Sequence, residues 1–93
     1  MEIKLNKNFS KLAMSGSTQW YEVKVNVECD NLLDIEQVEY YLDPSVSNPI
    51  IVSENSSNKF EVKTQSWKEF PVSAKVIFKD RKKTPLMLQN HLF

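Results

Sequence analysis

The residues best suited to acid–base or nucleophilic chemistry are a single histidine, His91, and a single cysteine, Cys29. General acid–base catalysis near neutral pH usually pairs a histidine with a carboxylate or hydroxyl group, and His91 lies close to the C-terminal end of the sequence. A cysteine nucleophile needs a stabilised thiolate and a neighbouring base, and no histidine or lysine cluster adjoins Cys29. We therefore expect a structural histidine, an inert thiol and no enzymatic activity.

Three acidic residues, Asp30, Asp34 and Glu36, are close enough in sequence to suggest a cation site, because Ca²⁺ prefers several oxygen ligands. Their spacing does not match an EF-hand loop, which has a central glycine and a distal bidentate glutamate. The sequence also lacks the Cys/His spacing of zinc sites and the glycine-rich loop that binds phosphate. We expect neither a bound metal nor another cofactor.

The residue best placed for recognition is Trp67, which lies in the polar segment 64–69 (TQSWKE). Exposed aromatic side chains on loops are enriched at binding surfaces. Trp67 is out of the inward register of the strand that follows, so its indole either faces a ligand or folds down to cap one end of the core. A second polar segment holds Asp43, Ser45 and Asn48, which either orient a small polar ligand or only form an Asp-Pro turn.

The elements that must position these residues are β-strands, because apolar and polar residues alternate along most of the chain. Val23, Val25 and Val27 share one face of a strand, and Tyr40 shares the inward register of Val38. The expected strands span residues 3–5, 20–27, 38–42, 60–64, 70–78 and 86–89. A short helical turn is expected at 34–37. Such strands predict an all-β, immunoglobulin-like β-sandwich of two packed antiparallel sheets, with about seven to eight strands.

Length and composition favour one domain, residues 1–93, because 93 residues leave no room for a second core. Twelve basic and twelve acidic residues cancel, whereas nucleic-acid-binding proteins usually carry a basic surplus. The local run 79–83 (KDRKK) either contacts an anion or forms a solvated hairpin turn. No apolar run approaches the roughly 18 residues of a membrane span, and the N-terminus does not resemble a signal peptide. With one cysteine, a cytoplasmic location is expected.

Three segments carry distinctive motifs in a fixed order: Trp20 at a strand start, residues 35–45 (IEQVEYYLDPS) followed by Asn48 and Pro49, and residues 66–70 (SWKEF). They resemble the YEATS domain family, most closely its prokaryotic branch. The corresponding family motifs are a strand-opening Trp, a V-x-Y-x-L-H-P-S/T-F-x-N-P segment and a G-W-G-E-F turn. The resemblance covers residues 2–93 and implies an immunoglobulin-like fold with Trp20 in the core.

The resemblance also implies a binding site. Eukaryotic members read acylated lysine in histone tails, and they hold the flat acyl amide between aromatic side chains with hydrogen bonds from a hydroxyl and a histidine. In this sequence Trp67 matches the aromatic residue of the second loop and Ser45 matches the hydroxyl. Asp43 stands where the family has histidine, Val46 where it has the second phenylalanine, and Gly16 where an upstream aromatic is expected. The resemblance therefore implies an incomplete acyl-lysine cage.

These observations favour a non-enzymatic recognition or sensor module of the bacterial YEATS type. It would bind a peptide or small ligand at the end carrying Asp43, Ser45, Val46 and Trp67, as part of a signalling protein. One alternative is a protein–protein interaction or assembly domain without a ligand pocket, which would use strand edges near Ile77 and segment 50–52. A second alternative is an acyl-lysine reader with a degenerate cage. Neither nucleic acid nor a membrane is expected as a partner of this segment, and the oligomeric state stays open.

Overall fold

The computed structural model describes residues 3–14, 16–44, 46, 48–68 and 70–90, and all of its regular elements are strands or single 3₁₀ turns. The strands are β1 (Ile3–Lys11), β2 (Tyr21–Cys29), β3 (Ile35–Tyr41), β4 (Ile50–Ser53), β5 (Val62–Ser66), β6 (Val72–Phe78) and β7 (Leu86–Asn90). The 3₁₀ turns are η1 (Leu32–Asp34) and η2 (Ser56–Asn58). Within this described part, no helix is long and apolar enough to cross a membrane.

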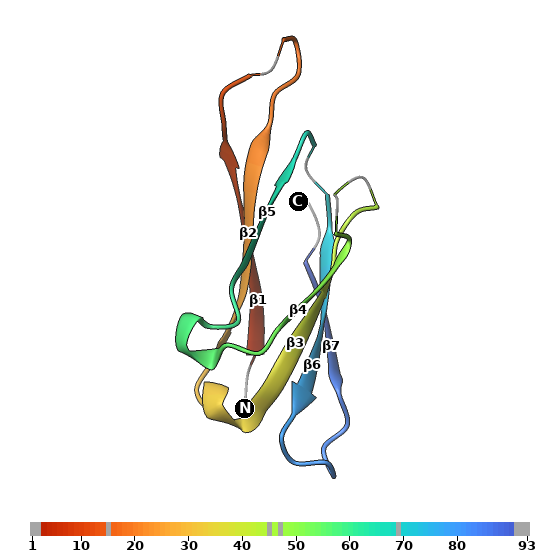
Figure 1. Ribbon diagram of the computed structural model, residues 1–93. Helices are drawn as coiled ribbons and strands as arrows, with labels where there is room; N and C mark the ends of the chain where they lie inside the picture. The colour runs from red at the N-terminus through yellow and green to blue at the C-terminus, as the bar shows by residue number, and fades with distance from the viewer. Residues whose placement is uncertain (1–2, 15, 45, 47, 69, 91–93) are drawn as a thin grey trace.

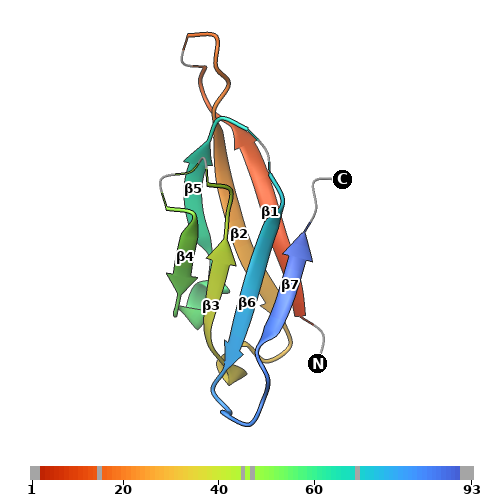
Figure 2. The same ribbon diagram turned by 90° about the vertical axis from the view of Figure 1, so that its right-hand side faces the viewer.

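The strands form two antiparallel sheets that pack face to face, which confirms the predicted sandwich (Figure 1). The smaller sheet has the order β1-β2-β5, and the larger has the order β4-β3-β6-β7. All neighbouring strands are antiparallel. On one side of the sandwich β1 lies beside β7 (Figure 2).

Most strand boundaries shift by one to three residues from the prediction, and β1 and β4 differ most. β1 continues to Lys11 instead of ending at Leu5, because the apolar residue Phe9 keeps the inward alternation. β4 was not predicted as a strand, since a four-residue run that starts directly after Pro49 carries little periodic signal. The helical turn predicted at 34–37 lies earlier, at Leu32–Asp34, and Ile35 already belongs to β3.

The core lies between the two sheets and follows the predicted alternation. Val23, Val25 and Val27 of β2 are at most 1% exposed, and they share the core with Val72, Ala74 and Val76 of β6, which are fully buried. Full burial of one such valine contributes about 1.5–3 kcal/mol. Tyr40 is also fully enclosed, as its register predicts, and its hydroxyl donates a 2.8 Å hydrogen bond to the carbonyl oxygen of Phe60.

Two consecutive residues after η2 have left-handed backbone conformations. Lys59 has φ 61° and Phe60 has φ 58°, although neither is glycine. The amide of Lys59 donates to Ser56 at 3.1 Å and its carbonyl accepts from Val27 at 3.1 Å. These bonds hold the turn while it places the Phe60 ring, which is 0% exposed, in the core. Non-glycine residues in this region cost about 1–2 kcal/mol each, so core packing and backbone pairing must offset the strain.

Trp20 is half-buried, so the expectation that it lies in the core is wrong. The residue precedes β2, and the pairing of β2 with β5 ends at Tyr21 and Ser66. Beyond that point the β1–β2 hairpin extends past the second sheet (Figures 1 and 2). Trp20 thus lies at the base of the part of the hairpin that projects past the second sheet, where its burial is only partial. Its carbonyl oxygen instead holds the hairpin by accepting from the Leu12 amide at 2.8 Å.

The charged run 79–83 forms the turn between β6 and β7. The Lys83 amide donates to the Asp80 carbonyl at 3.0 Å, and the Lys82 amide donates to the Asp80 carboxylate at 3.0 Å. Arg81 pairs with Glu36 at 3.3 Å. Of the two interpretations of this run, the structure therefore favours the solvated hairpin turn.

Candidate recognition site

Two loops meet at one end of the sandwich, one after β3 and one after β5. The β3–β4 loop is closed at its base, where the Leu42 amide donates to the Pro49 carbonyl at 2.6 Å. Within the loop, the Val46 amide donates to the Asp43 carbonyl at 3.1 Å, which is ordinary turn chemistry for an Asp-Pro sequence. Leu42 is 8% exposed and Val46 is 5% exposed. These two buried side chains anchor the loop and leave Asp43 between them at the surface.

The β5–β6 loop is fixed by Ser66, the last residue of β5. Ser66 is 2% exposed, its Oγ accepts from the Lys68 amide at 3.2 Å, and it donates to the Lys68 carbonyl at 2.8 Å. The hydroxyl thus satisfies two backbone groups that a turn would otherwise leave to solvent. The backbone on both sides of Trp67 is therefore held in place, whichever way the Trp67 and Lys68 side chains turn.

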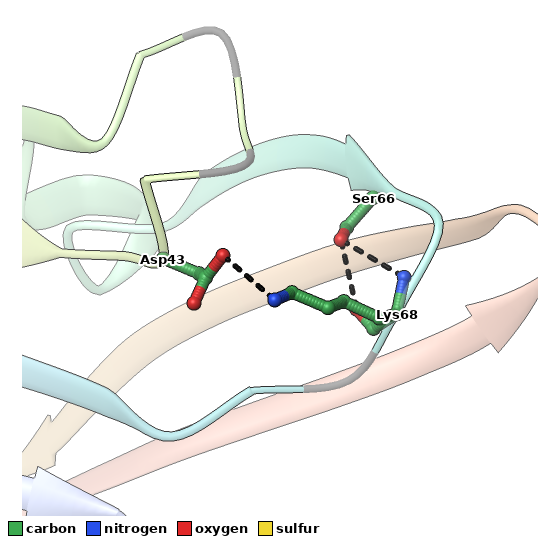
Figure 3. Close-up of polar contacts among 3 residues, drawn as sticks. All are labelled: Asp43, Ser66 and Lys68. Carbon is green, nitrogen blue, oxygen red and sulfur yellow. Dashed lines mark hydrogen bonds and ion pairs between the residues drawn. The ribbon is translucent and has the colours of Figure 1, made fainter.

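An ion pair joins the two loops. The Nζ atom of Lys68 lies 3.3 Å from Oδ2 of Asp43, with the Lys68 side chain 42% exposed and that of Asp43 25% exposed (Figure 3). Exposed ion pairs contribute about 0–1 kcal/mol. This contact therefore orients the loops more than it stabilises the fold, and it shows that the loops of Asp43 and Lys68 are neighbours.

Trp67 stands on the surface of this end. It is 50% exposed, and the Lys68 ammonium lies 5.3 Å from the centroid of its ring. Of the two orientations that the sequence allows, the structure shows the exposed one, because the indole does not fold into the core. The same lysine thus contacts an aromatic face and a carboxylate.

The other residues predicted for the site have different positions. Val46 is part of the buried core, so in this structure its side chain supports the loop from below and does not present itself to a ligand. Ser45 and His91 lie outside the described residues. Asn48 is exposed in the same loop as Asp43.

An aromatic cluster supports the loops from within the sandwich. The Phe9 ring makes edge-to-face contacts with Tyr21, at a centroid distance of 6.3 Å, and with Phe70, at 5.4 Å. Phe70 is 2% exposed and directly follows the loop that carries Trp67. Such pairs add about 0.5–1.5 kcal/mol of stabilisation beyond that of their buried area. The cluster therefore stabilises the part of the core that lies under the recognition end.

Lys68 is the site residue that reasoning from sequence missed. Relative to the family motifs, Ser66 and Lys68 replace the glycines that flank the tryptophan, and Asp43 replaces the histidine of the other loop. The signal available in the sequence was that Lys68 and Asp43, two replacements of opposite charge, lie on two different loops. Only the folded chain shows that they form one pair.

Two of the three acidic residues considered for a cation, Asp34 and Glu36, have other partners. The Asp34 carboxylate accepts from Asn31 at 3.0 Å, and Glu36 pairs with Arg81. Over the described ranges, no three His, Cys, Asp or Glu side chains gather as a metal site requires.

A hollow of about 500 Å³ lies at the opposite end of the sandwich, where β1 starts and β2 ends. It is lined by Lys4, Glu28, Cys29, Asp30, Leu32 and Lys59. Its volume lies within the usual range for small-molecule sites, but two ammonium and two carboxylate groups line it with no aromatic side chain. A hollow with this mixed charge selects no ligand class, so we regard the Trp67 end as the better candidate.

The chain is similar to known proteins in both sequence and fold. The chain matches the sequence model of the prokaryotic YEATS domain over residues 21–89. Among solved structures it is similar to one described as "The Yaf9 YEATS domain Recognizing H3K122suc Peptide", with a TM-score of 0.62 and 21% sequence identity. That match covers 98% of this chain and 67% of the other. No curated protein matches the sequence.

Proposed function

Because this chain belongs to the prokaryotic YEATS domain family, we propose that it is a non-enzymatic recognition module that binds a peptide or small ligand at the Asp43–Trp67 end. The observation that carries the proposal is the position of Trp67. A tryptophan that is 50% exposed on a loop with a fixed backbone presents a large aromatic face to a partner, and tryptophan is enriched at protein interfaces.

Two further observations support this choice of end. The ion pair between Asp43 and Lys68 places a carboxylate and an ammonium beside the indole, so the site offers apolar area together with groups that orient a polar ligand. A similar fold, the Yaf9 YEATS domain, has been solved with a peptide. We infer a peptide or small-molecule ligand here on the same architectural grounds.

An acyl-lysine cage fits this end less well. Clamping a flat amide needs aromatic faces on both sides, and Val46, which stands at the second aromatic position, is buried in the core. Asp43, which stands at the histidine position, is paired with Lys68. A degenerate acyl-lysine reader is therefore the weaker proposal.

An assembly role is the alternative that a separate observation favours. β4 is an edge strand, and its outward residues Ile50 and Val52 are 60% and 46% exposed. Ile77, on the same outer face two strands away, is half-buried. Edges without charge or proline can pair with another chain. This alternative predicts reversible self-association, which is tested below.

We further propose that the module acts in the cytoplasm as part of a signalling protein. Its single cysteine and its core of apolar side chains suit a reducing compartment. Sensor modules of this kind recognise a ligand without transforming it, and we propose no reaction for this chain.

Replacing Trp67 by alanine tests the site directly. A peptide array and a metabolite panel, read by thermal shift, would identify ligands of the unmodified protein. We expect Trp67→Ala to weaken binding of those ligands at least tenfold, since loss of a central aromatic anchor costs about 2 kcal/mol or more. The melting temperature should change by only a few degrees, because the side chain is half exposed.

Leu33→Ala is the matched control, because Leu33 is 68% exposed and lies in η1 at the opposite end. Ligands should bind this variant as they bind the unmodified chain. Equal binding by the Trp67→Ala variant would move the site away from this end, and the hollow beside η1 would then be examined. A large loss of stability in Trp67→Ala would assign the indole to packing.

A further inference from the structure

Lys68 occupies the place where a cationic ligand would bind. Its ammonium lies 3.3 Å from the Asp43 carboxylate and 5.3 Å from the Trp67 ring centroid. A carboxylate together with an aromatic face is the combination that attracts organic cations, because the ring quadrupole and the negative charge act in the same direction. The exposed surface of Trp67 is thus shared with a cation of the chain itself.

The Lys68 side chain is able to leave without unfolding the loop. Ser66 holds the backbone amide and carbonyl of Lys68, whereas the ammonium lies at the end of a side chain that is 42% exposed. An exposed cation–π contact and an exposed ion pair each correspond to a factor of up to about 5 in an equilibrium constant. A ligand can overcome contacts of this strength.

We propose that the Asp43–Trp67 site selects a cationic side chain, an alkylammonium or quaternary ammonium group on a peptide, and that Lys68 is an intramolecular competitor for it. This inference rests on the proposed recognition function. An incoming cation replaces Lys68 on the ring and on the carboxylate, while Lys68 turns to solvent. Without ligand, the site is therefore occupied by Lys68. A ligand binds only if it outcompetes the effective concentration of the Lys68 ammonium at the site.

The test compares short peptides of the form acetyl-Gly-X-Gly-amide, in which X is lysine, trimethyllysine, acetyllysine or succinyllysine. Lys68→Gln should strengthen binding of the lysine and trimethyllysine peptides by about 2- to 25-fold, the product of the two contacts removed. Asp43→Asn and Trp67→Ala should each weaken it. Lys63→Gln removes the same charge from an exposed position on β5 and should change binding much less.

Two results would overturn this proposal. One is a Lys68→Gln protein that binds the cationic peptides no better than the unmodified chain. The other is a Lys68→Gln protein that loses a succinyllysine peptide bound by the unmodified chain, because Lys68 would then be an anion-binding group. The recognition function itself would survive either result as long as Trp67→Ala still weakens ligand binding at least tenfold. Loss of ligand binding from the whole panel would instead remove the site.

Discussion

At the residue scale, the buried hydroxyl of Tyr40 links β3 to the turn that leads into β5. Tyr40 belongs to β3, and it donates to the carbonyl of Phe60, which lies between η2 and β5. Burial, and to a smaller extent the charge of Glu61, raises the pKa of this hydroxyl. A tyrosine whose pKa is higher in the folded state than in the unfolded state stabilises the fold fully below the unfolded pKa of about 10. That stabilisation is lost as the pH rises further.

Tyr40→Phe should show this effect. At neutral pH the variant should lose about 1–3 kcal/mol, because the Phe60 carbonyl stays buried without its donor. Above pH 10 the gap between the two proteins should narrow by up to about 1.4 kcal/mol per pH unit. Urea unfolding of both proteins at about pH 8 and about pH 11 measures this difference in the free energy of unfolding. The other titrating groups are common to both proteins, so their contributions cancel in the difference. A gap that is the same at both pH values would contradict the linkage.

At the element scale, the turn after η2 holds strain that core packing offsets. Lys59 has φ 61° and an exposed side chain, whereas Phe60 has φ 58° and a buried ring. The two positions therefore respond differently to substitution. At position 60 the fold needs the phenylalanine ring, which fills the core. At position 59 it needs only the left-handed backbone conformation.

Lys59→Gly should leave stability unchanged or raise it by up to about 1 kcal/mol, because glycine adopts a positive φ without a Cβ clash but loses more entropy on folding. Lys63→Gly, in the exposed register of β5, should instead destabilise by about 0.5–1 kcal/mol. Chemical denaturation of both variants gives the comparison. Equal losses would mean that the left-handed turn carries no strain.

Several strands and their buried positions could be predicted from the sequence. Alternation identified β2, β3 and β6 and the inward positions of Val25, Tyr40 and Val76, because burial on one face leaves a period of two in the chain itself. The sequence did not reveal that Asp43 and Lys68 meet, since that pair depends on how two loops are oriented across a sandwich. β4 was missed because its three β-branched residues, Ile50, Ile51 and Val52, show no alternation, although their composition favours a strand.

At the scale of the whole molecule, the exposed edge decides between recognition and assembly. The two strongly exposed side chains of β4, Ile50 and Val52, cover little area, whereas stable interfaces bury about 1,200–2,000 Å². The chain is also elongated, with extents of 50 × 23 × 22 Å and a radius of gyration of 14.0 Å. These dimensions give the radius of gyration expected of a monomer in solution.

We expect the protein to sediment as a monomer of 10.9 kDa at all concentrations tested, and small-angle scattering should give a radius of gyration close to that of the single chain. Val52→Lys places a charge on the edge of β4 and should change neither measurement. A sedimentation coefficient that rises with concentration in the unmodified chain, and not in Val52→Lys, would support the assembly alternative.

The β1–β2 hairpin has a practical consequence for following ligand binding. It extends past the second sheet at the end that carries Trp67 (Figure 1), Met14 near its tip is 58% exposed, and a Cβ at Gly16 would meet no atom within 4 Å. Exposed tips of this kind accept insertions well. A dye-labelled peptide inserted beside Gly16 would therefore report ligand binding from a position next to the binding end. The insertion would leave the sandwich intact.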